Sequence, residues 1–212
     1  MHFETLLFDL DGTLVDSSFD LALAVNLLRG ELGLEPLPLA TVIGYVGDGA
    51  TLLVTRALPA GTFKPEYLTR FLEIYREHLF DQTLPYPGIV PFLESLADRK
   101  LAVVTNKPLQ LSLELLDGLD LKRFFPVIWG AEDGRAKKPD PQPVLEALQR
   151  LQSSAASAVM IGDHITDLRA GAAAGVKTCF CSYGLGRQDD VPCDFVAASP
   201  ADLTRLFGGV VE

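Results

Sequence analysis

This chain of 212 residues has few cysteines, little positive charge and no long apolar run. Its three cysteines (Cys179, Cys181 and Cys193) are an odd number, and we expect reduced thiols rather than disulfides or a metal site. No stretch approaches the roughly 20 apolar residues that cross a bilayer. The first residues are acidic where an export signal would be basic. These features predict a cytoplasmic protein with no membrane partner.

Positive charge is scarce, with 18 Lys and Arg residues against 28 Asp and Glu residues and a net charge of −10. A nucleic-acid partner would require a basic stripe that displaces counterions from phosphates, and the basic residues here are scattered. We therefore expect no nucleic-acid partner. The length suits one sizeable domain, or a domain with a smaller one inserted. The sequence carries no signal for a particular oligomeric state.

Apolar runs of strand length alternate with helical periodicity over most of the chain. The expected strands are Thr5–Leu10, Leu101–Thr105, Val127–Gly130, Ala158–Gly162 and Lys177–Cys181. The later strands are separated by expected helices at Leu109–Leu119, Pro141–Leu151 and Thr166–Ala174. This alternation predicts an α/β fold with a Rossmann-like parallel sheet covered by helices.

The segment after the first strand has a different character. The expected helices begin at Ser17 or Ser18, at Ala50 and at Pro65, and end near Gly33, Leu58 and Phe80. A weak strand candidate lies at Val42–Val46. We predict a small all-helical cap at residues 16–84, inserted after the first strand of a core formed by residues 1–15 and 85–212. Pro85–Gly88 is the expected return hinge.

Four polar motifs lie just beyond the carboxyl ends of expected strands. They are Asp9-x-Asp11-Gly12-Thr13, Thr105-Asn106-Lys107, Lys137-Lys138-Pro139-Asp140 and Gly162-Asp163-x-x-x-Asp167. Open parallel sheets bind ligands at that edge, so we expect the four motifs to meet there.

The chemistry of these side chains suits phosphate. A carboxylate nucleophile can form an aspartyl-phosphate, but an anion that attacks an anion requires a hard cation. Asp9 and Asp163 offer the oxygen ligands that Mg²⁺ prefers. A threonine hydroxyl and a lysine ammonium can hold the phosphoryl oxygens, and Asp11 can act as general acid and base.

Each motif taken alone has a simpler explanation. Asp9 and Asp11 could end a strand in an Asp-Gly turn, whereas a calcium loop fails because Leu14 stands where that loop requires glycine. Thr105 and Asn106 could cap a helix. Asp163 and Asp167 could be a pair that favours the start of a helix, Gly44–Gly49 could be a plain turn, and Lys137 could be a solvated surface charge.

Taken together, FDLDGTLVDS, VVTNKP, KKPDP and GDHITD resemble the four motifs of the haloacid dehalogenase-like phosphohydrolases. The helical insertion resembles the small cap of one subgroup. Within it, GYVGDGATLLVTRAL, HLFDQTLPYPG and TNKP are similar to the phosphoglycolate phosphatase-like proteins. His164 departs from the pattern, because a small hydroxyl residue is commoner there, and Leu58–Pro65 is short for such a cap.

The resemblance implies a role for each motif residue. Asp9 would be the nucleophile and Asp11 the acid and base, and Mg²⁺ would be held by Asp9, Asp163 and the main-chain carbonyl of Asp11. Thr105 and Lys138 would bind the phosphoryl group. The remaining expected roles are substrate binding by Gly12, Thr13 and Asn106, orientation of the lysine or of a metal-bound water by Asp167, and substrate selection by the cap-loop residues Gly47, Asp48 and Gly49.

We therefore expect a Mg²⁺-dependent phosphomonoester hydrolase acting through an aspartyl-phosphate on a small phosphorylated metabolite, with 2-phosphoglycolate as the expected substrate. The sequence also leaves open a phosphatase or phosphotransferase of the same family for a nucleotide, sugar phosphate or pyrophosphate. A non-enzymatic phospho-receiver module stays open too, although such a module needs neither Asp11 nor a cap.

Overall fold

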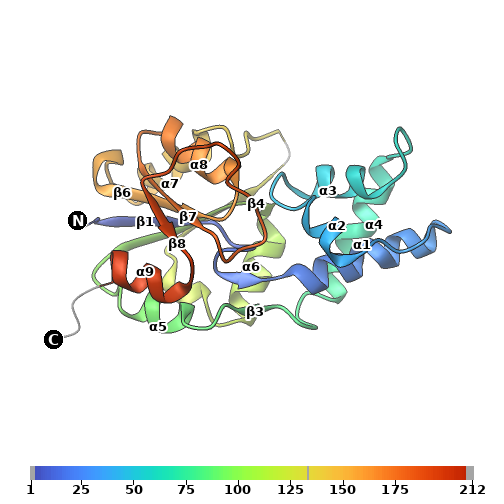
Figure 1. Cartoon of the computed structure of the whole chain (residues 1–212), viewed down its shortest axis with the longest axis horizontal. Helices are drawn as coiled ribbons and strands as arrows, with labels where there is room; N and C mark the ends of the chain where they lie inside the picture. The colour runs from blue at the N-terminus through green and yellow to red at the C-terminus, as the bar shows by residue number, and fades with distance from the viewer. Residues whose placement is uncertain (1–2, 133, 209–212) are drawn as a thin grey trace.

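The computed structural model describes residues 3–132 and 134–208. Its centre is a parallel sheet (Figure 1). The sheet has six strands in the order β5-β4-β1-β6-β7-β8. The strands are β1 (Thr5–Phe8), β4 (Lys100–Pro108), β5 (Val127–Ala131), β6 (Ala158–Gly162), β7 (Lys177–Cys181) and β8 (Phe195–Ala197). The expected parallel α/β fold is confirmed, although β8 was not predicted.

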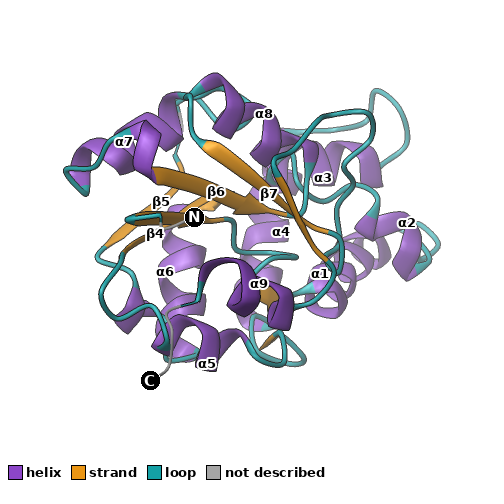
Figure 2. Cartoon of the chain, turned by 60° about the vertical axis from the view of Figure 1, so that its left-hand side comes forward, coloured by secondary structure: helices purple, strands orange, loops and turns teal. Residues whose placement is uncertain are grey.

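Helices cover both faces of the sheet, with α7 and α8 on one face and α5, α6 and α9 on the other (Figure 2). Their bounds are α5 (Ile89–Glu94), α6 (Leu109–Gly118), α7 (Gln142–Arg150), α8 (Ile165–Ala173) and α9 (Pro200–Phe207), and short 3₁₀ turns lie at Lys122–Phe124 and Ala155–Ser157. Alternate residues of β1 serve the two faces, since Leu6 and Phe8 pack in one core and Leu7 in the other. A strand buried on both sides therefore has a continuous apolar sequence.

Four helices pack on one another beyond the carboxyl ends of the strands (Figure 1). They are α1 (Ser18–Glu31), α2 (Leu39–Ile43), α3 (Ala50–Ala57) and α4 (Pro65–Glu77), which we call the α1–α4 cluster. The strand candidate at Val42–Val46 was wrong. Val42 lies in α2 and is fully buried, so tertiary packing overrides its β-branched preference.

The chain enters and leaves the α1–α4 cluster through a pair of short antiparallel strands, β2 (Val15–Asp16) and β3 (Leu84–Pro85). Next to this pair, the buried Asp20 carboxylate accepts hydrogen bonds from the main-chain N–H groups of Gln82 and Thr83 and from the Thr83 hydroxyl. The two connections between the sheet and the cluster are therefore tied together.

Some local predictions needed correction. Ser17 is the N-cap residue of α1, but its hydroxyl donates to Asp11 and forms no cap hydrogen bond with the helix. Cys179, Cys181 and Cys193 are free in this structure, and Cys179 and Cys181 are buried. Among the described residues, no helix is both long enough and apolar enough to cross a membrane.

Candidate active site

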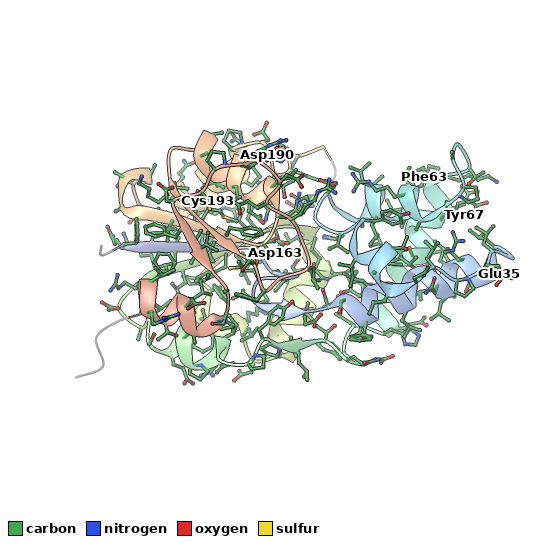
Figure 3. All side chains as sticks on the ribbon, in the orientation of Figure 1. Glu35, Phe63, Tyr67, Asp163, Asp190 and Cys193 are labelled. Atoms are coloured by element: carbon green, nitrogen blue, oxygen red, sulfur yellow. The ribbon has the colours of Figure 1, made fainter. Side chains whose placement is uncertain are left out.

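The carboxyl ends of β1, β4 and β6 lie at the edge of the sheet that faces the α1–α4 cluster. The polar motifs lie at the same edge. Asp9 directly follows β1, Thr105 lies near the end of β4, and Asp163 directly follows β6. Figure 3 shows Asp163 within the sheet-containing part, whereas Glu35 lies at the far end of the α1–α4 cluster. The parallel arrangement explains why distant segments of sequence share one edge.

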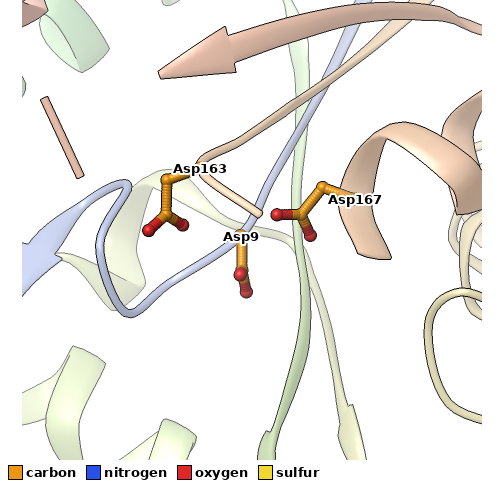
Figure 4. A group of neighbouring side chains, drawn as sticks. All are labelled: Asp9, Asp163 and Asp167. Atoms are coloured by element: carbon orange, nitrogen blue, oxygen red, sulfur yellow. The ribbon is translucent and has the colours of Figure 1, made fainter. Parts of the chain in front are cut away.

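Three carboxylates form a buried acidic group at this edge (Figure 4). Asp9, Asp163 and Asp167 each offer an oxygen, and these oxygens lie within 4.8 Å of one another. Burial and the neighbouring Asp167 raise the pKa of Asp9 to about 6. Burial, Asp9 and Asp167 raise the pKa of Asp163 to about 8. Closely spaced carboxylates that resist ionisation are a donor set suited to a hard divalent cation.

Asp163 is fixed by contacts from two loops. Its Oδ2 accepts hydrogen bonds from the main-chain N–H groups of Leu185 at 2.9 Å and Gly186 at 2.8 Å. Its Oδ1 accepts a hydrogen bond from the Thr13 hydroxyl at 3.1 Å. Thr13, expected to bind substrate, thus directs its hydroxyl to Asp163. Gly12 packs against the same carboxylate, because a Cβ on Gly12 would lie 2.0 Å from Asp163 Oδ2.

Lys138 is a buried ammonium between two of the carboxylates. Its Nζ lies 3.0 Å from Asp9 Oδ1 and 2.5 Å from Asp167 Oδ1, and it also donates to the Val104 carbonyl. Burial lowers the pKa of Lys138, but Asp167 and Asp9 outweigh burial and the pKa is raised. The other Asp167 oxygen accepts the His164 N–H, which fixes the carboxylate at the start of α8. Asp167 therefore holds Lys138 beside Asp9.

Asp11 lies in a second polar group, which reaches into the α1–α4 cluster. Its carboxylate accepts hydrogen bonds from the Ser17 hydroxyl at 2.6 Å and from Lys107 Nζ at 3.0 Å. Lys107 also donates to the hydroxyl of Tyr75, in α4, at 2.6 Å. Lys107 belongs to one of the four motifs, but no role was expected for it. Its spacing from Thr105 was the available signal, because residues two apart in a strand face the same side.

The loop between α2 and α3 lies directly on the site. The Asn106 side chain donates to the Gly47 carbonyl at 3.0 Å and to the Lys138 carbonyl at 2.8 Å. A Cβ on Gly47 would lie 2.8 Å from the His164 ring, so the loop approaches within contact distance. Asp48 instead forms an ion pair with Arg56, 2.6 Å away. Of the three expected cap-loop residues, Gly47 and Gly49 line the cavity described next and Asp48 does not.

A cavity with an empty volume of about 620 Å³, including the space at its mouth, separates the α1–α4 cluster from the strand ends. Its floor is polar and its opposite wall is largely apolar, formed by side chains of α1, α3 and α4. The polar lining includes Asp9, Asp11, Thr105, Asn106, Lys107, Asp163 and His164, and the apolar lining includes Leu21, Leu53, Phe71 and Leu72. A concave site with a few convergent polar groups suits a small ligand.

Comparisons with known proteins agree with this geometry. Residues 6–181 match the haloacid dehalogenase-like hydrolase family. The chain is 40% identical over 204 residues to a phosphoglycolate phosphatase of Aquifex aeolicus, covering 95% of each chain. It is 38% identical to a phosphoglycolate phosphatase of Caulobacter vibrioides, covering 95% of this chain and 89% of that one.

A solved structure has the same fold. The crystal structure of a predicted phosphoglycolate phosphatase from Haemophilus somnus superposes with a TM-score of 0.87 at 25% identity, covering 97% of this chain and 98% of that one. These matches favour an enzyme over a phospho-receiver module and confirm the resemblance drawn from the motifs. The chain belongs to the haloacid dehalogenase-like hydrolase family.

Proposed function

We propose that this protein is a Mg²⁺-dependent phosphatase that hydrolyses 2-phosphoglycolate through an aspartyl-phosphate on Asp9. The observation that carries the proposal is the position of Asp9 in the lining of the cavity between the strand ends and the α1–α4 cluster, with Lys138 3.0 Å away and Asp11 lining the same cavity. The two phosphoglycolate phosphatases that match nearly the whole chain support the choice of substrate. We propose that the protein acts in the cytoplasm and that its partner there is a small phosphorylated metabolite.

The proposed domain division follows the two connections at β2 and β3. Residues 16–84 form a cap domain, and residues 1–15 and 85–212 form the core domain that carries the motifs. The cap supplies the apolar wall of the cavity through residues such as Leu53 and Phe71. Covering the cavity keeps bulk water away from the phosphoryl group.

The donor set fits Mg²⁺. Asp9 and Asp163 have raised pKa values because they are buried close to other carboxylates, and a divalent cation would offset that excess of negative charge. These two carboxylates and the main-chain carbonyl of Asp11 would hold the ion. When bound, Mg²⁺ reduces the repulsion between the nucleophile and the phosphoryl oxygens.

The residues of this chain divide the reaction into two displacements. An Asp9 oxygen attacks phosphorus, the bond from phosphorus to the ester oxygen breaks, and Asp11 donates a proton to the departing oxygen. Asp11 then takes a proton from water as that water attacks the aspartyl-phosphate, which releases inorganic phosphate and restores Asp9.

The remaining motif residues bind the phosphoryl group or position the residues that react. The Lys138 ammonium and the Thr105 hydroxyl bind phosphoryl oxygens, together with main-chain N–H groups near Gly12 and Asn106. Asp167 orients Lys138. In this proposal Thr13 acts by holding Asp163, since its hydroxyl donates to that carboxylate.

A screen of phosphorylated metabolites with and without Mg²⁺, scored by released phosphate, tests the proposal. We expect Mg²⁺-dependent release that is fastest from 2-phosphoglycolate. Asp9→Asn should abolish it, whereas Asp117→Asn, a matched change at an exposed site on α6, should leave it intact. A preference for nucleotides or sugar phosphates would contradict the substrate, and turnover by Asp9→Asn would contradict the mechanism.

A further inference from the structure

Lys107 is a buried cation that the two displacements leave without a role. Its side chain is 3% exposed, yet it lines the cavity. Its Nζ donates to the Asp11 carboxylate at 3.0 Å and to the Tyr75 hydroxyl at 2.6 Å, so the buried ammonium is paired with a carboxylate and a phenol. Among the described residues that line the cavity, Lys107 is the only lysine or arginine. Lys107 is therefore the cation available to a second anionic group of a ligand.

Tyr75 places a hydrogen-bond donor beside this ammonium. Its phenolic oxygen accepts a hydrogen bond from Lys107, and burial raises the pKa of Tyr75 to about 12. The phenol is therefore neutral and retains its proton. A phenol that accepts one hydrogen bond can still donate another. Because Tyr75 also lines the cavity, its proton and a proton of the ammonium can both reach a ligand there.

We propose that Lys107 and Tyr75 together bind the carboxylate of the substrate, beside the oxygen that Asp11 protonates. This inference rests on the proposed function, because it assigns the non-phosphate end of the same substrate. A carboxylate has two acceptor oxygens and one negative charge, which an ammonium and a neighbouring phenol match.

The position of Asp11 sets where the carboxylate must lie. In 2-phosphoglycolate a single methylene carbon separates the leaving oxygen from the carboxylate. A carboxylate so close to the leaving oxygen lies near Asp11, and Lys107 Nζ is 3.0 Å from Asp11 Oδ1. Within the part of the chain that the structure describes, the cavity wall that includes Leu53, Phe71 and Leu72 contributes no charged side chain that could also bind the carboxylate.

The two carboxylate-binding residues come from different parts of the molecule. Lys107 belongs to β4, whereas Tyr75 belongs to α4, where its ring stacks parallel to that of Phe71 with ring centroids 5.9 Å apart. The Lys107 ammonium also lies 4.4 Å from the centroid of the Tyr75 ring. The carboxylate site is complete only while α4 lies over β4. A substrate carboxylate bound there would therefore help to hold the α1–α4 cluster in place.

A pair of substrates that differ in one group tests the site. In 2-hydroxyethyl phosphate, a neutral hydroxymethyl group replaces the carboxylate of 2-phosphoglycolate. Lys107→Met should reduce kcat/KM for both, since Lys107 contacts Asp11, but the loss for 2-phosphoglycolate should be roughly 10²-fold larger. Tyr75→Phe should shift selectivity in the same direction by about 10-fold. Lys137→Met, the same charge change at a half-buried lysine that does not line this cavity, should leave selectivity unchanged.

Equal losses on the two substrates for both Lys107→Met and Tyr75→Phe would overturn the inference, and so would a selectivity change of the same size for Lys137→Met. Calorimetric titration with glycolate provides a test without turnover. We expect the wild-type protein to bind glycolate and Lys107→Met to bind it at least roughly 10-fold more weakly. Equal binding, or none to the wild type, would overturn the carboxylate site. Failure to hydrolyse any phosphomonoester would instead contradict the proposed function, and the titration would still decide the carboxylate site.

Discussion

The backbone of Gly12 runs so close to the Asp163 carboxylate that a Cβ on Gly12 would lie 2.0 Å from Oδ2. Gly12 also has φ +81°, in the left-handed region that favours glycine. Both constraints act at the turn after β1, where the Gly12 N–H donates to the Val15 carbonyl. The glycine of the first motif therefore lets the chain turn and lets Asp163 approach Asp9.

We predict that Gly12→Ala displaces Asp163 and weakens Mg²⁺ binding and phosphatase activity by at least roughly 10-fold, since a buried carboxylate would lose its place. Mg²⁺ titration and phosphate release measure the two effects. Gly61→Ala is the matched control, because Gly61 has φ +76° and a Cβ there would meet nothing within 4 Å. It should cost only about 1 kcal/mol of stability. If the two variants bind Mg²⁺ and release phosphate equally well, the close contact between Gly12 and Asp163 is not needed for function.

Asp11→Asn should slow hydrolysis of an alkyl phosphate by roughly 10²–10⁴-fold, because the amide cannot supply the proton that the leaving oxygen requires. A p-nitrophenyl ester should be affected much less, since its leaving group departs without a proton. Mg²⁺ binding should remain measurable by calorimetry, because the proposed contact is the main-chain carbonyl. Loss of Mg²⁺ binding in this variant would mean that the Asp11 carboxylate is a ligand rather than the acid.

The stability of the metal-free protein should fall as pH rises from about 5 to about 8. The folded protein keeps protons on Asp9 and Asp163, whose pKa values are raised from 3.8 to about 6 and about 8, while the unfolded chain has already released them. Fewer protons bound in the unfolded state mean that stability decreases with pH. Mg²⁺ competes with these protons, so the rise in Tm that Mg²⁺ produces should be larger at the higher pH.

Thermal unfolding with Mg²⁺ and with a chelator, across this pH range, measures both slopes. Asp163→Asn should flatten the pH dependence of the metal-free protein because the amide does not titrate. A Tm of the metal-free wild type that increases with pH would contradict the assignment of raised pKa values to this pair.

Lys138→Met should lower the free energy of unfolding by about 3–5 kcal/mol, because it leaves the buried carboxylates of Asp9 and Asp167 without their shared cation. Lys177→Met removes a partner of Asp194 from an exposed ion pair and should cost less than about 1 kcal/mol. Denaturant unfolding of the metal-free variants compares the two. A similar loss of unfolding free energy in the two variants would indicate that solvent screens the charges around Lys138 as strongly as it screens a surface ion pair.

Much of the fold and of the site could be predicted from local sequence. The apolar run of β1 is continuous because helices cover both faces of the sheet, and the polar residues that follow it stand out against that run. Since parallel strands bring their carboxyl ends to one edge, the positions of Asp9, Thr105 and Asp163 in the sequence were enough to predict their convergence.

Contacts between distant segments had no comparable signal. Leu185 and Gly186 bind Asp163 through main-chain N–H groups, which any residue could supply, so their sequence does not reveal this role. The contact between Tyr75 and Lys107 depends on how α4 lies over β4, and helical periodicity places a residue on a face without saying what that face meets. For Asp48 the sequence motif suggested a contact with substrate, whereas in the structure its carboxylate forms an ion pair with Arg56. The motif gave no indication of this ion pair.

The paired strands β2 and β3 also bear on how such a protein could be rebuilt. Asp16 and Leu84 are directly opposite each other in the antiparallel pair. Opposed residues of this kind lie about 5 Å apart, a gap that a tight turn of about two residues closes. Both ends of the intervening segment therefore lie at one position, and neither end belongs to the six-stranded sheet. If residues 16–84 are a cap domain, as we propose, exchanging it at this paired position should leave Asp9, Thr105 and Asp163 in place at the edge of the sheet.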